Sequence, residues 1–387
     1  LADTLPELDD GIREEVLERV PNATLAEALQ ELDSDDAAAV VEDLEDDQRE
    51  RVLAAMPELD RAAIESSLGY EEDSAGRLMQ REVMAAPQFW SVGDTIDHVR
   101  AQGEDLPELF FDVYVVDPLN KPVGGVAISR LLRSPRDTNL TDLMEPVNAI
   151  AVDQDQEEVA YIFEKYHLIS APVTDAAGRL VGQITVDDIV NIIQEENRED
   201  ILRLAGVADE DRGSGVLEIV RGRVPWLTIN LATAVLGASV IGWFEGTIKQ
   251  IVALAVLMPI VSALGGNAGT QALTVTVRAL ATRELNASNA VRTFWRELLV
   301  GCANGLVLAP LIGVAAGLWA GDWRMGAVIG AAMVLNLLVA ATVGVLTPLT
   351  LSKLKFDPAV SSAVFVTATT DFFGFLIFLG LATVVLL

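Results

Sequence analysis

The sequence predicts a multidomain protein in which an acidic helical domain, a pair of α/β repeats and a connecting helix precede an all-α membrane domain of five transmembrane helices. Three observations lead to this prediction. Net charge is −32 over residues 1–223 but +2 over residues 224–387, which together give −30. Two stretches about 60 residues apart share one pattern, and five long apolar segments follow them. The strongly acidic first part attracts cations and excludes nucleic acid as a partner.

Residues 1–76 are predicted to form an all-α acidic domain of short amphipathic helices. Apolar residues recur there at helical spacing, for example at Ile12, Val16 and Val20. The acids from Asp33 to Asp36 are placed to cap the next helix. The acidic clusters leave two interpretations open, a solvated module that binds a partner or a divalent-cation site against another domain. These clusters are Asp33, Asp35 and Asp36, and Glu71, Glu72 and Asp73.

Residues 77–140 and 141–194 repeat one pattern, a helix followed by strand, turn and strand. The helix and two strands are expected at 95–101, 113–117 and 123–129 in the first half, and at 156–166, 171–175 and 178–185 in the second. This alternation predicts two small α/β domains packed with pseudo-symmetry.

Both halves resemble cystathionine-β-synthase (CBS) domains, with Leu78-Met79 and Leu143-Met144 at their beginnings. The resemblance implies a regulatory pair that dimerises and commonly binds adenine nucleotides. The run Gly182-x-x-Thr185-x-x-Asp188 matches the family's ribose-and-phosphate motif, so Thr185 and Asp188 are the implied residues for ATP or another adenine nucleotide. The first half has Leu132 in place of the acid. A dimerisation and sensing scaffold without nucleotide is therefore the alternative.

Residues 195–222 are predicted to connect the soluble domains to the membrane domain. An acidic helical run continues to Leu204, and the Gly-Ser-Gly stretch that follows Arg212 is a candidate hinge. A helix in this position is suited to transmit motion.

Residues 223–387 contain five apolar segments that are each long enough to cross a bilayer, at about 224–244, 251–278, 298–320, 325–351 and 358–387. Two basic residues, Lys249 and Arg324, fall in the connections on one side, and eight fall on the other. The eight are Arg221, Arg223, Arg278, Arg283, Arg292, Arg296, Lys353 and Lys355. The positive-inside rule therefore predicts a multi-pass protein of the cytoplasmic membrane with its N-terminal module in the cytoplasm and its C-terminus outside.

One ionisable residue, Asp371, lies near the middle of the last apolar segment. At about 1.5 Å per residue it is roughly 20 Å from Pro358 and roughly 24 Å from the last residue, deep in the hydrocarbon. A carboxylate there is costly and normally faces a bundle interior, a water-filled path or a cation. Thr367 is one turn earlier on the same face. The alternative is a protonated Asp371 that hydrogen-bonds a neighbouring helix for packing.

The second apolar segment contains Pro259 and three glycines at 265, 266 and 269, which are expected to interrupt its helical hydrogen bonds. Asn267, Gln271 and Thr274 form a polar stripe on one helix face. Facing Asp371, this stripe would surround a water-filled space with oxygen ligands. A close-packed crossing of helices through small residues is the alternative.

Oxygen ligands with one carboxylate per chain favour Mg²⁺, which keeps several of its waters. A two-fold dimer would bring two Asp371 side chains near one axis and balance a dication. Ca²⁺, Mn²⁺ and Co²⁺ stay open on ligand type alone.

The order of the domains and several motifs resemble the MgtE family of magnesium channels and transporters. The motifs are Tyr-Glu-Glu-Asp-Ser-Ala-Gly-Arg-Leu-Met at 70–79, Pro259 with Gly-Gly-Asn-Ala-Gly-Thr-Gln at 265–271, Arg-Ala-Leu-Ala-Thr-Arg at 278–283, and Asp357-Pro358-Ala359 leading to Thr370-Asp371. The resemblance implies a homodimer with its pore at the dimer axis and Asp371 as the ion-selecting carboxylate. The expected pore residues are Asp371, Asn267, Thr367, Gln271 and Gly266.

The same resemblance implies that cytosolic Mg²⁺ bridges acidic faces of the N domain, the CBS pair and the connecting (plug) helix, and so holds the pore shut. The implied sensor ligands are Asp36, Glu157, Asp188, Glu196, Glu199, Asp200 and Asp357. Asn191 stands where an acid is expected, and Ala363 offers no polar partner two turns before Asp371. The number of sensor ions therefore stays open.

The predicted function is uptake of Mg²⁺ through a channel or transporter that cytosolic Mg²⁺ closes. Two rivals stay open, a transporter of Mg²⁺, Co²⁺ or Mn²⁺ coupled to H⁺ or Na⁺, and a nucleotide sensor that the spans only anchor in the membrane. No Ser/His or Cys/His pair, phosphate-binding loop or zinc motif supports an enzyme.

Overall fold

The computed structural model describes residues 1–6, 8, 10–102, 106, 110–207, 216–286, 288–359 and 362–387. The chain divides into two compact units, Leu1–Asn197 and the described residues from Arg198 onward. The predicted hinge at 212–215 lies outside the described residues.

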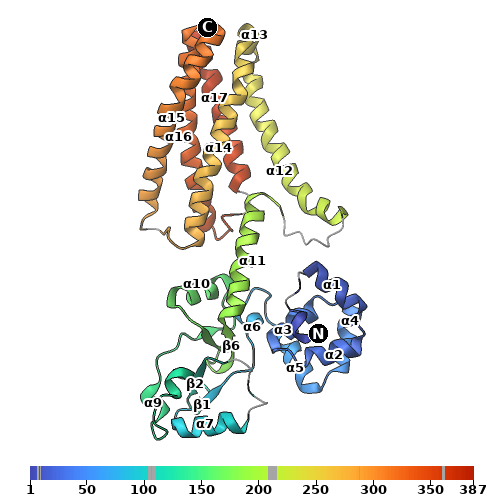
Figure 1. Cartoon of the computed structure of the whole chain (residues 1–387). Coiled ribbons are helices and arrows are strands. Elements are labelled where there is room, and N and C mark those ends of the chain that lie inside the picture. The colour runs from blue at the N-terminus through green and yellow to red at the C-terminus, as the bar shows by residue number, and fades with distance from the viewer. Residues whose placement is uncertain are drawn as a thin grey trace. The chain divides into compact units, whose positions relative to one another are not determined.

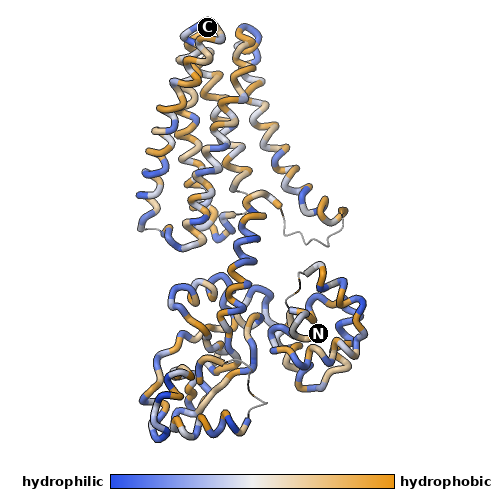
Figure 2. Tube along the Cα trace, in the orientation of Figure 1, coloured by the Kyte–Doolittle hydropathy of each residue, from blue (hydrophilic) through white to orange (hydrophobic). Residues whose placement is uncertain are grey.

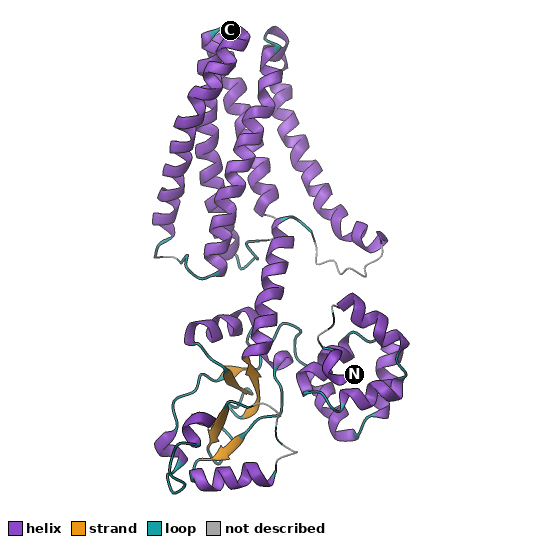
Figure 3. Ribbon diagram, viewed as in Figure 1, coloured by secondary structure: helices purple, strands orange, loops and turns teal. Residues whose placement is uncertain are grey.

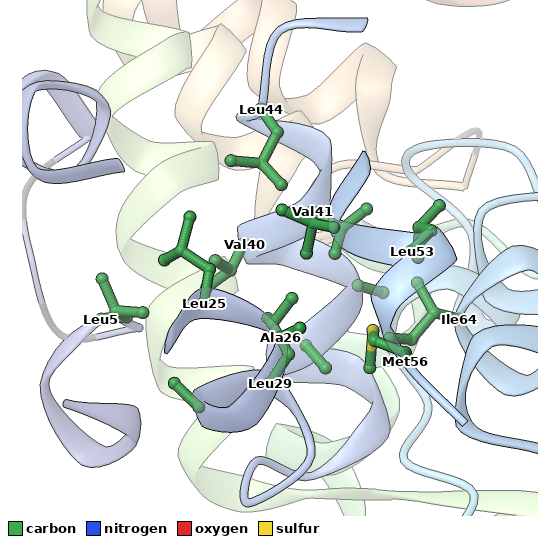
Figure 4. Close-up of a cluster of buried hydrophobic side chains, with 14 of the residues drawn as sticks. Leu5, Leu25, Ala26, Leu29, Val40, Val41, Leu44, Leu53, Met56 and Ile64 are labelled. Atoms are coloured by element: carbon green, nitrogen blue, oxygen red, sulfur yellow. The ribbon is translucent and has the colours of Figure 1, made fainter. Parts of the chain in front are cut away.

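The first unit begins with an all-α domain, as predicted. A short 3-10 helix at Ala2–Thr4 is followed by α1 (Asp10–Arg19), α2 (Asn22–Leu29), α3 (Ser34–Glu42), α4 (Asp46–Ala55) and α5 (Glu58–Ser67). The helices enclose a core that includes Leu5, Leu25, Val40 and Val41, all without exposed surface (Figure 4). Asp33 precedes α3 at the capping position, but its side chain makes no capping hydrogen bond there, so that detail of the prediction was wrong.

Two three-stranded sheets with the same strand order follow, which confirms the internal repeat. Their strands are coloured orange in Figure 3. The first sheet and its helices are β1 (Ala85–Pro87), α7 (Val92–Ala101), β2 (Asp112–Val116), β3 (Pro122–Ala127) and α8 (Ile128–Leu131). The second are β4 (Ile150–Ala151), α10 (Gln156–Tyr166), β5 (Ser170–Thr174) and β6 (Leu180–Thr185). The short helix that precedes each repeat packs on the other one: α6 (Ala75–Leu78) contacts β4 and α10, and α9 (Leu140–Leu143) contacts β3. In each sheet the middle strand pairs in parallel with the first strand and antiparallel with the third. The strands β1 and β4 were not predicted, because two or three residues are too few to show an alternating pattern.

The second repeat ends in α11 (Val186–Leu204), a single helix that includes the predicted boundary between residues 194 and 195. The sequence suggested a separate connecting helix there. The structure differs because no Gly or Pro interrupts the helical pattern between Val186 and Leu204.

The second unit contains α12 (Val216–Trp243), α13 (Glu245–Gln250), α14 (Ala253–Ala281), α15 (Ala290–Ala320), α16 (Trp323–Lys353) and α17 (Ser362–Leu386) (Figure 1). Five of these, all but α13, are long and apolar enough to cross a membrane, as predicted (Figure 2). The helix α16 packs against α14, α15 and α17 and is the most buried of the five. The helices α14 and α17 also pack against each other, so residues of these two helices can form a common site.

The prediction of an interrupted second span was wrong, because α14 is helical from Ala253 to Ala281 with Pro259 inside it. Side-chain donors reinforce its backbone: the Thr270 hydroxyl donates to the carbonyl of Gly266 at 3.0 Å, and Asn336 of α16 donates to the carbonyl of Val261 at 3.0 Å. Such side-chain donors supplement the backbone hydrogen bonds of a membrane helix that contains several glycines. The alternative interpretation, a close-packed crossing, is the one that the structure supports, since Gly265 and Gly269 are buried against α16 and α17.

Candidate ion pathway and acidic sites

Asp371 lies on α17 where it meets α14 and α12. The hydroxyl of Ser262 on α14 donates a hydrogen bond to Oδ1 of Asp371 at 2.5 Å. From α12, Gly237 comes so near that a Cβ atom there would lie 4.0 Å from the Cβ of Asp371. The residue is half-buried. The sequence pattern therefore identified the acid but missed Ser262, whose role depends on tertiary contact.

The predicted polar stripe runs along the exposed face of α14. Asn267 and Gln271 are exposed, and none of the hydrogen bonds among the described residues joins either amide to Asp371. Gly266 faces α17, where a Cβ on that glycine would lie 3.9 Å from Cγ2 of the exposed Thr367. The two helices thus bring Gly266 and Thr367 together, while the amides of the stripe face away from the protomer.

Asn336 of α16 is a fully buried amide that the sequence pattern did not single out. Its Nδ2 donates to the carbonyl of Val261 at 3.0 Å, and its Oδ1 has no hydrogen-bond partner. The amide lies against two glycines: a Cβ on Gly265 would come within 2.2 Å of Nδ2, and one on Gly374 within 2.8 Å. A polar residue within an otherwise apolar span is the sequence signal that would have found it.

The second unit contains a cavity of about 420 Å³ between the end of α11, α12 and α17. Its walls are Arg203, Leu204, Ala205, Gly206, Val207, Arg223, Trp226, Leu227, Asn230, Ala363, Val364 and Thr367. Thr367, a predicted pore residue, therefore faces the same cavity as the last turn of the predicted plug.

Two predicted sensor acids of this unit share one arginine. Arg203 Nη1 donates to Oδ2 of Asp357 at 2.7 Å, and the same guanidinium pairs with Glu199 one turn earlier on α11. Asp200, also predicted as a ligand, is half-buried and follows Glu199 in the chain. Glu199 and Asp357 are thus both paired with the positively charged side chain of Arg203.

In the first unit, acids of the N domain meet the start of α11. Burial raises the pKa of Asp35 well above its usual range, and the neighbouring charges of Asp188 and Asp36 add to the effect. One oxygen of Asp35 is buried without a hydrogen-bond partner. Burial likewise raises the pKa of Asp188 to about 6. A hydrogen bond from Thr185 lowers this pKa, whereas the charges of Asp187 and Asp36 raise it further. Carboxylates are therefore held together here at an electrostatic cost.

Polar contacts between the N domain and the segment 77–82 fix the same junction. The hydroxyl of Ser34 donates to Glu82 at 2.8 Å and accepts from the backbone N–H of Arg81 at 2.8 Å. Arg77 pairs with Glu42 at 2.5 Å. The first turn of α3 is consequently held against the segment 77–82, which itself bonds Gln183 of β6.

The other two predicted acids of the first unit are Glu196 and Glu157. Glu196 on α11 accepts a hydrogen bond from Gln156 of α10 at 2.7 Å, and Glu157 is exposed at the start of α10. Within the part of the chain that the structure describes, no three Asp, Glu, His or Cys side chains are grouped closely enough to hold a metal ion. The sensor ligands therefore stay a prediction.

The predicted nucleotide residues are in contact with each other, since the Thr185 hydroxyl donates to Asp188 at 2.9 Å. A cavity of about 230 Å³ lies elsewhere in the repeats. Its walls are Asp112, Tyr114, Gly125, Ala127, Arg130, Glu145, Pro146, Val147, Asn148, Leu168, Ser170 and Pro172, and they include neither Thr185 nor Asp188.

Models of three families match the chain: the MgtE divalent cation transporter over residues 258–381, the MgtE intracellular N domain over residues 1–73, and the CBS domain over residues 140–195. The magnesium transporter MgtE of Bacillus subtilis (strain 168) is 32% identical over 386 residues, which cover 99% of this chain and 85% of that protein. The magnesium transporter MgtE of Thermus thermophilus is 33% identical over 366 residues, or 94% of this chain and 79% of that protein.

A similar solved structure is that of the cytosolic domain of the Mg²⁺ channel MgtE in complex with ATP, with 33% identity and a TM-score of 0.47 over 49% of this chain and 78% of that one. On the identity and coverage of the two curated relatives, the chain belongs to the MgtE family of magnesium transporters.

Proposed function

We propose that this protein carries Mg²⁺ across the cytoplasmic membrane along a path between two copies of the chain, past Asp371. The observation that carries the proposal is the polar stripe on α14. Asn267 and Gln271 are exposed on a helix that is long and apolar enough to span the bilayer. An amide left in hydrocarbon without a partner costs several kcal/mol, on the order of 2–7. A second copy and a water-filled path would remove that cost.

The ligand chemistry along this face suits a hydrated dication. Asp371 supplies one carboxylate per chain, and Thr367, Asn267 and Gln271 supply neutral oxygens. Mg²⁺ is usually held by one or two carboxylates while it keeps several waters. Two copies of Asp371 near a common axis would balance its charge.

Flux into proteoliposomes tests this function. Purified protein should carry Mg²⁺ down its electrochemical gradient, and Asp371→Ala should abolish the flux. The control variant Asp137→Ala removes an exposed acid of the soluble part and should leave the flux unchanged. Flux that required an opposing H⁺ or Na⁺ gradient would favour the coupled transporter, and an Asp371→Ala variant with full flux would remove Asp371 from the pathway.

We further propose that cytosolic Mg²⁺ closes the pathway by binding the acidic faces of the soluble part. Support comes from the electrostatic repulsion that Asp188 and Asp36 exert on Asp35, which a dication would relieve. The cavity shared by Thr367 and the end of α11 is where a displaced helix would change access. We expect millimolar Mg²⁺ to protect the full chain from protease. The double variant with Asp36→Asn and Asp188→Asn should show no such protection.

An adenine nucleotide is a further proposed ligand of the CBS pair, supported by the motif that contains Thr185 and Asp188. Calorimetric titration with ATP tests it, and Asp188→Ala should weaken binding if this motif holds the ribose.

The proposed orientation has the soluble part in the cytoplasm and the C-terminus outside. Its support is the excess of basic residues, such as Lys353 and Lys355, in the connections on one side of the spans. Labelling of single cysteines, introduced at residues 353 and 324 in a Cys302→Ser background, would report the two sides separately.

A further inference from the structure

We propose that Ser262 is a specificity-determining residue of the ion pathway: its hydroxyl bonds one oxygen of Asp371, so that the other oxygen is the more available one to a passing ion. This inference rests on the proposed function, since it assigns a property to Asp371 as the pathway carboxylate.

The contact is short and selective. Ser262 Oγ lies 2.5 Å from Oδ1 of Asp371, within the range of a strong hydrogen bond between a hydroxyl and a carboxylate. Among the residues that the structure describes, no other hydrogen bond reaches this carboxylate. One oxygen of Asp371 is therefore engaged by the protein, and the other is left for water or an ion.

The hydroxyl of Ser262 behaves differently from its neighbours on α14. A Ser or Thr within a helix commonly donates to the carbonyl four residues earlier. Thr270, Thr274 and Thr276 all do so, with distances of 2.7–3.0 Å. Ser262 instead donates across to α17, so its direction is set by the packing of the two helices rather than by its own helix.

Asn336 holds that packing in register. Its amide donates to the carbonyl of Val261, the residue before Ser262, and lies against Gly265 and Gly374. These two glycines stand one turn after Ser262 and one turn after Asp371. The buried Asn336 amide therefore fixes α14 and α17 at the height where the Ser262 hydroxyl meets the Asp371 carboxylate.

A carboxylate with one oxygen occupied discriminates between dications. Ca²⁺ accepts six to eight oxygens and often takes both oxygens of one carboxylate, whereas Mg²⁺ demands near-octahedral geometry and keeps several waters. Bidentate binding at Asp371 would use the oxygen that already accepts the Ser262 hydrogen bond, so the cation and the hydroxyl would compete for its electron density. The contact therefore penalises Ca²⁺ more than hydrated Mg²⁺, which needs one oxygen only.

The test compares Mg²⁺ and Ca²⁺ flux into proteoliposomes for the unsubstituted chain and four variants. Ser262→Ala should raise the ratio of Ca²⁺ to Mg²⁺ flux about tenfold, in line with the loss of a hydrogen bond to a charged group. Ser262→Thr keeps the hydroxyl and should keep the ratio. Ser239→Ala is the matched control, because that serine donates to the carbonyl of Val235 on its own helix. Asp371→Asn reports on the proposed function itself.

The outcomes separate the two claims. An Asp371→Asn variant with normal flux contradicts the proposed function. Loss of flux in Asp371→Asn together with an unchanged ratio in Ser262→Ala overturns the present inference alone. A folded Ser262→Ala protein that carries neither ion overturns it as well, because selectivity is the property assigned. Should Ser262→Ala fail to fold, Ser262→Thr against Ser262→Val, which has the same shape without the hydroxyl, gives the same comparison.

Discussion

Arg203 Nη1 donates a hydrogen bond to Oδ2 of Asp357 at 2.7 Å, and this contact ties the last turn of α11 to the segment that leads into α17. The same guanidinium pairs with Glu199. The side chains of Arg203 and Asp357 remain 38% and 32% exposed, so water screens the pair and its contribution is about 0–1 kcal/mol. A Mg²⁺ ion that binds Asp357 must therefore compete with the Arg203 side chain, which Asp357 binds only weakly.

Replacement of Arg203 by Gln should sensitise the protein to cytosolic Mg²⁺. The change frees Glu199 and Asp357 without altering their positions in the chain. We expect the Mg²⁺ concentration that halves flux to fall about twofold to fivefold, which corresponds to at most about 1 kcal/mol. Titration of Mg²⁺ on the cytosolic side of proteoliposomes measures this concentration.

Arg100→Gln serves as the control for that titration, since Arg100 is an exposed residue of α7. A rise in the half-closing concentration in Arg203→Gln would show that the arginine helps closure rather than opposing it.

Low pH should strengthen the junction of the N domain with the start of α11 when Mg²⁺ is absent. The folded-state pKa of Asp35 is raised, and that of Asp188 is raised to about 6. Carboxylates with raised pKa values contribute stability that is fully present below their unfolded pKa, about 3.9, and is lost as pH rises through the folded pKa. Protease protection without Mg²⁺ should therefore be greater at about pH 5.5 than at about pH 8, and saturating Mg²⁺ should remove the difference.

Asp35→Asn should reproduce the effect of protonation at about pH 8. The amide removes a buried charge whose oxygen has no partner, so the free energy of unfolding of this region should rise by about 1–3 kcal/mol without Mg²⁺. Thermal unfolding of the full chain measures the change, with Asp137→Asn as an exposed control. Lower stability of Asp35→Asn under these conditions would mean that the carboxylate is stabilising as a charge.

The parts of the fold that could be predicted are those with a local signal. The five spans follow from apolar length, and the repeats follow from strand alternation and spacing. The predicted boundary between the second CBS domain and the connecting helix falls inside one helix, α11. No residue near that boundary is a helix-ending signal, so the sequence could not show where one part passes into the other. Pro259 suggested a broken α14, but the helix continues from Ala253 to Ala281 with the proline inside it, and no local pattern showed that a residue as far away in sequence as Asn336 adds a hydrogen bond to the carbonyl of Val261.

The candidate site divides in the same way. Asp371 could be identified because it is the only ionisable residue in its apolar segment. Ser262 could not, because a hydroxyl that bonds its own helix and one that bonds the next helix have the same sequence context. The sensor acids were placed by resemblance, and only contacts such as Arg203 with Asp357 show which groups they meet.

The substitution Gly265→Ala should shift α14 relative to α17 and so disturb the hydrogen bond between Ser262 and Asp371. The Cβ of Gly265→Ala would lie 2.2 Å from Nδ2 of the fully buried Asn336, so either the amide or the helix must move. Overpacking of this kind costs about 1–3 kcal/mol. We expect a lower melting temperature and a higher ratio of Ca²⁺ to Mg²⁺ flux. Gly242→Ala on α12 meets nothing within 4 Å and should change neither.

A second variant, Asn336→Ala, tests whether Gly265 and Asn336 share one space, because it removes the amide that the methyl group of Gly265→Ala would contact. Alone it should also destabilise, because it leaves a cavity and removes the bond to Val261. If the amide and the glycine share one space, the double variant should lose less than the sum of the single losses, by about 0.5–3 kcal/mol. Additive losses would mean that Gly265 and Asn336 act independently, and the register of α14 and α17 would then depend on other contacts.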